Sequence, residues 1–217
     1  KVATSPLPPL PGCENLAPLE HFEPQAFHSE DGQEQEVCNF ILMLSLAYND
    51  FKDLLWAFNQ LSKCRQPDPS RLLAYNGQFV GMRSHLTRLA HSLVFELAEL
   101  IRNNGSVLEH ALFKRALTFV SKNNRKHWDE LVSFSNGDIE GSGKDLARIS
   151  MLIRHNISAH YYQPKFLAEG YRRFFSKSHD QAHTNAYISR GPSLEGTRFY
   201  FADAAIDGCF ENLIGPG

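Results

Sequence analysis

The segment Glu34–Cys64, EQEVCNFILMLSLAYNDFKDLLWAFNQLSKC, decides the fold class of this 217-residue chain. Apolar residues recur along it at steps of three and four, the period of an amphipathic helix. They are Val37, Phe40, Ile41, Leu44, Ala47, Tyr48, Phe51, Leu54, Leu55, Phe58 and Leu61. The pattern predicts a helix over about 35–64 whose wide apolar face places it centrally. Two prolines in the following segment 66–70, QPDPS, predict its end.

A second long helix is predicted over 79–102, antiparallel to the first. Its apolar stripe comprises Phe79, Met82, Leu86, Leu89, Leu93, Leu97 and Leu100. His85 and His91 also lie on this helix. Histidines at such positions are typical of helix surfaces or hydrogen-bonded cores, and we interpret both in that way.

The remaining elements are shorter. Asn103, Asn104 and Gly105 predict a C-cap. Ser106 and Glu109 form a capping box that predicts a third helix from Val107 to about 123. Further helices are expected near 128–134, along 146–162, over 165–177 from Pro164, and over 204–213. Between them we expect a glycine-rich connection at 136–143, an irregular loop at 178–197 and a strand-like segment at 198–202.

These elements predict an all-α fold, a bundle of about five to six helices within a single domain over 35–217. Prolines are dense in residues 1–34 and favour an extended arm that lies across the domain. The C-terminal region is expected to be largely irregular.

Charge and cysteine content restrict the classes of function. The net charge of −2 provides no overall basic field, so any contact with nucleic acid must be local or shared across an oligomer. The four cysteines are widely spaced, which favours a reduced, cytoplasmic protein. No apolar run of helix-spanning length is present, so no membrane segment is expected. A charged segment followed by an apolar core is missing from the first residues, so no signal peptide is expected.

The segment Leu146–Tyr162, LARISMLIRHNISAHYY, carries the strongest functional signal. It begins as an amphipathic helix and then places Arg154, His155, Asn156 and His160 within seven residues. A histidine near neutral pKa can exchange a proton with a 2′-hydroxyl or a leaving oxygen. A guanidinium can bind the phosphate and stabilise its developing charge, and an amide can orient either group. These are the residue types that metal-independent phosphodiester cleavage requires.

Helical geometry separates the two principal residues of this segment. At about 100° per residue, His160 falls near Ile153 and Asn156, while Arg154 lies about 120° away. On a straight helix Arg154 and His160 do not meet. We therefore expect a bend in the helix, or a second subunit that completes the site.

The run Arg154-His155-Asn156-Ile157-Ser158-Ala159-His160 resembles the signature of the HEPN superfamily, an arginine and polar residue followed closely by a histidine in a helical bundle. The resemblance implies a homodimer that joins two motifs, and a metal-independent endoribonuclease, in some members a toxin or defence component. It implies that Arg154 binds phosphate and that His160 acts as base or acid. His155 or Asn156 would support them, without metal or cofactor.

Nearby cations predict where RNA would lie. Lys165, Arg172 and Arg173, with Lys177, form a local basic cluster after the motif. They are the candidate RNA contacts.

Other interpretations remain open or are excluded. Arg154 and His160 could instead pair with buried carboxylates and serve only packing. The fold could also act without catalysis, holding a protein or nucleotide in the same groove or through the proline arm. Gly141-Ser-Gly-Lys144 lacks the spacing of a phosphate-binding loop, and His179 with His183 lacks further metal ligands, so neither a nucleoside triphosphatase nor a zinc site is expected.

Overall fold

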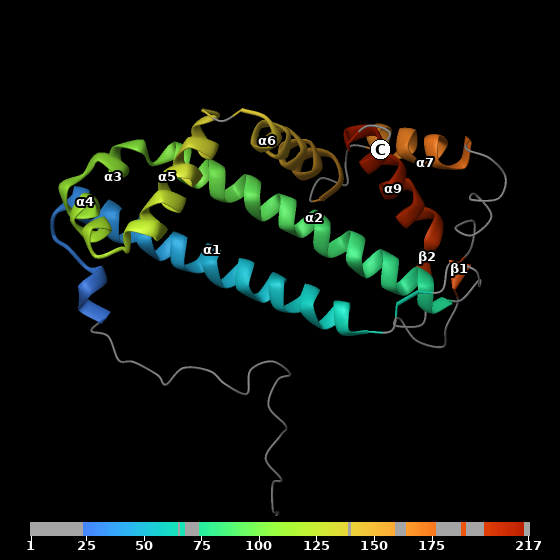
Figure 1. Ribbon diagram of the computed structural model, residues 1–217, viewed down its shortest axis with the longest axis horizontal. Coiled ribbons are helices and arrows are strands. Elements are labelled where there is room, and N and C mark those ends of the chain that lie inside the picture. Colours follow the sequence, from blue (N-terminus) through green and yellow to red (C-terminus); the bar gives the residue numbers. More distant parts are fainter. Residues whose placement is uncertain are drawn as a thin grey trace, which may run out of the picture.

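The computed structural model describes residues 24–64, 66–67, 74–138, 140–158, 164–176, 188–189 and 198–214. In these ranges the chain is all-α, as predicted (Figure 1). The α-helices are α1 (Gly32–Lys63), α2 (Ala74–Asn103), α3 (Gly105–Glu109), α4 (Ala111–Thr118), α5 (Lys122–Asn136), α6 (Ser142–Ile153), α7 (Pro164–Ser176) and α9 (Tyr200–Ile214). A 3₁₀ helix, η1 (Pro24–Phe27), precedes them, and a π-helix, η2 (Arg154–Ser158), follows α6. Two short strands, β1 (Ile188–Ser189) and β2 (Arg198–Phe199), pair antiparallel.

α1 begins at Gly32, within the arm predicted for residues 1–34, and the side chain of Asp31 caps its N-terminus. Asp31 Oδ1 accepts hydrogen bonds from the backbone N–H groups of Gln33 at 2.9 Å and Glu34 at 3.0 Å. These contacts satisfy two donors that a helix N-terminus leaves unpaired. η1 packs against α1, where Gln35 Nε2 donates to the Phe27 carbonyl at 3.2 Å. Within the arm predicted for residues 1–34, residues 24–27 form η1 and the residues from Gly32 onward belong to α1. Residues 1–23 lie outside the described part of the chain.

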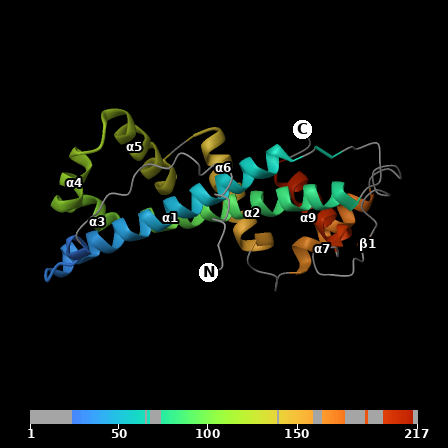
Figure 2. The ribbon, with the colours of Figure 1, turned by 90° about the horizontal axis from the view of Figure 1, so that it is seen from below.

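The central helix is α2, and the expectation that the first long helix would be central is wrong. α2 contacts α1 on one side and α6, η2 and α9 on the other, with α5 near its C-terminal end (Figures 1 and 2). α1 forms an outer layer. Its large exposed apolar side chains are Leu42, Met43, Leu46, Tyr48 and Leu55.

The described helices pack around two separate apolar clusters. The first comprises Val37, Phe40, Ile101, Val107 and Phe113, from α1, α2, α3 and α4. Partly buried Trp128, Leu131 and Val132 of α5 pack against it.

The second cluster joins α6 and η2 to α9 through Ile153, Ile157, Ile206 and Cys209. Ile153 is fully buried. Burial of such side chains contributes about 1.5–3 kcal/mol each. This cluster anchors the candidate motif, because two of its members flank or belong to η2.

The region between α2 and α6 differs most from prediction. The single helix expected from Val107 to about 123 is divided into α3 and α4, and α5 starts at Lys122 with Ser121 as its cap. The capping box is also wrong: Asn104 precedes α3, Ser106 lies within it, and Glu109 pairs with Lys114 instead. The glycine-rich connection is confirmed, with Gly137 (φ 79°) and Gly141 (φ 65°) in left-handed backbone that favours glycine.

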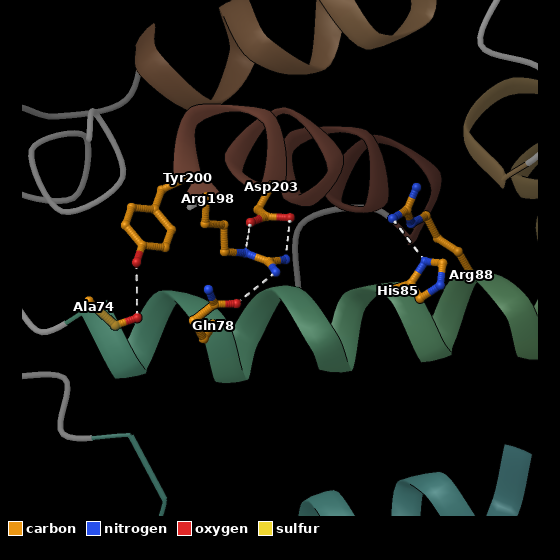
Figure 3. Close-up of polar contacts among 7 residues, drawn as sticks. All are labelled: Ala74, Gln78, His85, Arg88, Arg198, Tyr200 and Asp203. Carbon is orange, nitrogen blue, oxygen red and sulfur yellow. Dashed lines mark hydrogen bonds and ion pairs between the residues drawn. The ribbon is translucent and has the colours of Figure 1, made fainter. Parts of the chain in front are cut away.

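The C-terminal helix α9 packs against the start of α2 (Figure 3). It confirms the closing helix predicted over 204–213 but begins earlier, at Tyr200, so this part of the C-terminal region is helical rather than irregular. Arg198 donates to both Asp203 oxygens, at 2.7 Å and 3.0 Å, and to Gln78 Oε1 at 3.1 Å. Tyr200 Oη donates to the Ala74 carbonyl at 3.0 Å. A Cβ atom at Gly77 would overlap the Tyr200 ring, so glycine makes this approach sterically feasible. The strand predicted at 198–202 shortens to Arg198–Phe199 because α9 begins at Tyr200.

No helix among the described residues is both long enough and apolar enough to cross a membrane.

Candidate functional site

The motif lies where the chain changes from α-helix to π-helix. α6 ends at Ile153, and Arg154–Ser158 continue as η2. A π-helix pairs residues five apart and so widens the turn, an irregularity frequent at functional sites. Arg88 of α2 fixes this turn by donating from Nη1 to the Ile157 carbonyl at 2.9 Å. The chain therefore departs from regular α-helical geometry within the motif, at Arg154–Ser158.

Arg154 reaches across to α2. Its Nε atom donates to Glu96 Oε1 at 2.6 Å, and the two side chains are 23% and 53% exposed. A guanidinium has five N–H donors, and this contact uses one of them. Glu96 therefore orients the Arg154 side chain at the protein surface.

The two residues that follow Arg154 have different environments. His155 is exposed, and its ring meets the Phe95 ring edge to face at 5.2 Å between centroids. Asn156 donates from Nδ2 to the Leu152 carbonyl at 2.8 Å, one turn back. Asn156 thus supports the change of helix, while His155 lies at the surface beside Arg154.

A third contact joins α2 to α6 behind the motif. His91 Nδ1 lies 3.0 Å from Ser150 Oγ, and Ser150 is buried. Burial lowers the pKa of His91, so its neutral form is favoured. Ser150 can then donate its hydroxyl proton to the ring. The interpretation of His91 as a hydrogen-bonded core residue is consistent with this contact.

A groove of about 590 Å³ opens beside the motif, between α2, α5 and α6. We call it the α2–α5–α6 groove. Phe95, Phe134 and Met151 contribute apolar surface, and His155 of the motif lines one end. Its charged lining residues are Glu99, Arg102, Lys144 and Arg148. Arg102 pairs with Glu99 and donates to the Ser135 carbonyl. Lys144 and Arg148 lie on α6, and all three cations are exposed.

The predicted site residues fall into two groups. Arg154 and His155 contact α2, and Asn156 bonds back to α6, while His160 lies outside the described residues. Arg172 and Arg173 are exposed on α7, which contacts η2. Lys165 lies in α7, but its side chain is not among those described. Lys177, His179 and His183 lie outside the described residues.

Three residues that contact the motif were not identified from the sequence: Arg88, Phe95 and Glu96. All lie on α2, within about 100° of one another around the helix axis at about 100° per residue. Arg88 and Glu96 belong to a row of polar residues along this side of the helix, with His85, His91, Glu99 and Arg102. This polar row was the sequence signal that could have pointed to the α2 residues of the site, but nothing in the sequence indicated which element would pack against it.

Comparison with protein-family models, curated proteins and solved structures finds no match to this chain. The assignment of function therefore depends on the chemistry of the site's own residues.

Proposed function

We propose that this protein is a HEPN-like, metal-independent endoribonuclease whose site contains Arg154 and His160. The observation that carries the proposal is the widened η2 turn. In this turn Arg154 contacts Glu96 and His155 contacts Phe95, both on α2, next to a groove with exposed cations. Packing alone does not require a charged and an imidazole side chain at this surface.

The reaction assigned to this site is an internal transfer of the phosphodiester. The ribose 2′-oxygen attacks the adjacent phosphorus as His160 accepts the hydroxyl proton, and the bond to the 5′-oxygen breaks. The leaving oxygen takes up a proton, giving a 5′-hydroxyl and a 2′,3′-cyclic phosphate. Arg154 stabilises the charge that develops on the phosphate oxygens. Glu96 positions Arg154, and Asn156 maintains the turn that presents it.

The proposal includes a homodimer that completes the site. Arg154 and His160 would be separated on a straight helix, and the chain departs from α-helical geometry at Arg154–Ser158. A second copy would bring a second Arg154 and His160 to the same phosphate. Mixing His160→Ala with Arg154→Ala protein then restores part of the activity if the two copies share a site.

A non-catalytic protein- or nucleotide-binding module of the same fold is the alternative, and RNA is the nucleotide ligand to be tested. One observation favours it: Arg154 and Asn156 each have a partner within the protein, Glu96 and the Leu152 carbonyl. In this case the groove binds RNA, but no bond is cleaved.

The test is incubation of purified protein with mixed RNA in EDTA, beside His160→Ala and the matched variant His127→Ala. His127 is exposed on α5 and hydrogen-bonds Glu130, away from the motif. Cleavage by the parent and by His127→Ala, but not by His160→Ala, is the expected result, with 2′,3′-cyclic phosphate ends. Equal cleavage in all three samples would reveal a contaminating nuclease, and RNA binding without cleavage would establish the alternative.

A further inference from the structure

The α2–α5–α6 groove has two different walls. On one side, Lys144, Arg148, Met151 and His155 lie at steps of four, three and four along α6 and η2. These steps align the side chains in a row, over about 16 Å at 1.5 Å per residue. The row therefore leads from two exposed cations to the histidine beside Arg154.

The opposite side of the groove, formed by α2 and α5, carries aromatic and apolar side chains beside the Glu99–Arg102 ion pair. Phe95 of α2 and Phe134 of α5 both line it and are partly exposed. Phe95 also meets His155 edge to face. Aromatic faces stack nucleobases irrespective of base identity, while cations along a groove follow the phosphates. Both requirements for binding a single strand are met in this groove.

Charge distinguishes this groove from a second of similar size. The other groove, about 690 Å³ between α3, α4 and α5, includes Phe113 and Trp128, with Lys114, Arg115 and Arg125. It also contains two carboxylates, Glu109 and Asp129. In the α2–α5–α6 groove, Glu99 is the carboxylate among the described lining residues, and it pairs with Arg102. Lys144 and Arg148 therefore give this groove the clearer preference for an anion.

We propose that the α2–α5–α6 groove binds single-stranded RNA, with phosphates on Lys144 and Arg148 and a base stacked on Phe95, and directs the strand towards Arg154. The inference rests on the proposed function, because it assigns the substrate as unpaired RNA and gives its path. It also identifies residues that the motif does not contain.

The test measures binding of a short fluorescein-labelled oligouridylate by anisotropy in EDTA, on a His160→Ala background that prevents cleavage. The variant Lys144→Gln/Arg148→Gln is compared with Arg115→Gln/Arg125→Gln, which removes equal charge from the other groove. We expect the first to lose at least tenfold in affinity and the second to retain it. Two lost phosphate contacts also reduce the slope of log K against log salt by about 1.4, at roughly 0.7 per contact.

Stacking is tested separately at Phe95. Phe95→Leu keeps an apolar side chain but removes the aromatic face, and about tenfold weaker binding is expected. Phe95→Tyr keeps the ring and should bind as the parent does. Thermal melting of each variant separates lost binding from lost folding.

The outcomes distinguish this inference from the proposed function. Retained cleavage by Lys144→Gln/Arg148→Gln with unchanged RNA affinity overturns the groove assignment alone. Groove-dependent RNA binding without cleavage by the parent supports the groove and overturns the catalytic proposal. Equal competition by polyglutamate or by double-stranded RNA shows that the groove selects neither bases nor single strands, which also overturns the inference.

Discussion

Arg154 Nε and Glu96 Oε1 lie 2.6 Å apart, joining η2 to α2 across 58 residues of sequence. Glu96 is 53% exposed, and exposed ion pairs contribute only about 0–1 kcal/mol to stability. The contact can, however, determine where the Arg154 guanidinium points. Its principal effect should therefore be on function.

Glu96→Gln is expected to lower RNA cleavage about tenfold through mispositioned Arg154, while the free energy of unfolding falls by less than about 1 kcal/mol. Urea unfolding and initial cleavage rates give the two quantities. Glu109→Gln is the control, because Glu109 forms an exposed pair with Lys114 far from the motif. Unchanged cleavage in Glu96→Gln would show that the ion pair does not position a functional group.

The crossing of α7 and α9 depends on two glycines. A Cβ atom added to Gly208 would overlap the Gly170 carbonyl, and backbone atoms cannot move aside as a flexible side chain can. Gly208→Ala should destabilise the protein by about 1–3 kcal/mol, the usual cost of overpacking. Gly105→Ala is the matched control because a Cβ atom there meets no atom within 4 Å. A Gly208→Ala melting temperature equal to that of the parent would argue against the close crossing.

The raised pKa of the Asp207 carboxyl predicts that the protein loses stability as the pH rises. Burial, followed by the nearby Asp203 and Glu211 carboxylates, raises the pKa of Asp207 from 3.8 to about 6. The folded state therefore retains a proton that the unfolded state loses between these pH values. The stabilisation is complete below pH 3.8 and is lost as pH rises through 6.

Asp207→Asn should consequently be more stable than the parent at pH 7.5, by up to about 3 kcal/mol, with a smaller difference at pH 4. Urea midpoints at the two pH values provide the measurement. Asp129→Asn, on the exposed surface of α5, serves as control. A difference between parent and Asp207→Asn that is independent of pH would exclude titration of Asp207 as its cause.

His91 predicts the opposite dependence at mildly acidic pH. Its pKa is lowered by burial, so the unfolded state takes up a proton before the folded state does. The contribution of neutral His91 to the free energy of unfolding is therefore complete above pH 6.5 and falls as the pH drops below that value. Burial lowers the pKa of His85 also, and Arg88 and Arg198 add to this effect.

His91→Gln, which does not titrate and can still bond Ser150, should reduce the loss of stability between pH 7 and 5. His85 would account for part of the loss that remains. Unfolding free energies at these two pH values, with His127→Gln for comparison, test this expectation. An identical pH dependence in the parent and His91→Gln would contradict it.

The long helices could be predicted because their signal is local. The apolar period of 35–64 and the prolines after it correspond to α1, and Pro164 starts α7 as expected. The break near Asn104 was predicted from the cap at Asn103–Gly105. The break at His110 could not be predicted, because packing of Val107 and Phe113 against α1 and α2 overrides a continuous helical pattern. The start of α9 at Tyr200 similarly depends on contacts with α2 that no nearby residue signals.

The sequence by itself determined the helical class, where the two long helices end and the place of the polar motif, because periodicity and residue chemistry are properties of neighbouring positions. The start of α2 at Ala74, before the predicted residue 79, was not determined in this way. Only the tertiary structure decided that α2 is central, that Arg154 meets Glu96 and that Phe95 faces His155. Those pairings join residues about 60 positions apart. They depend on which apolar surfaces bury one another, and a polar row on α2 acquires its partners only after that packing is complete.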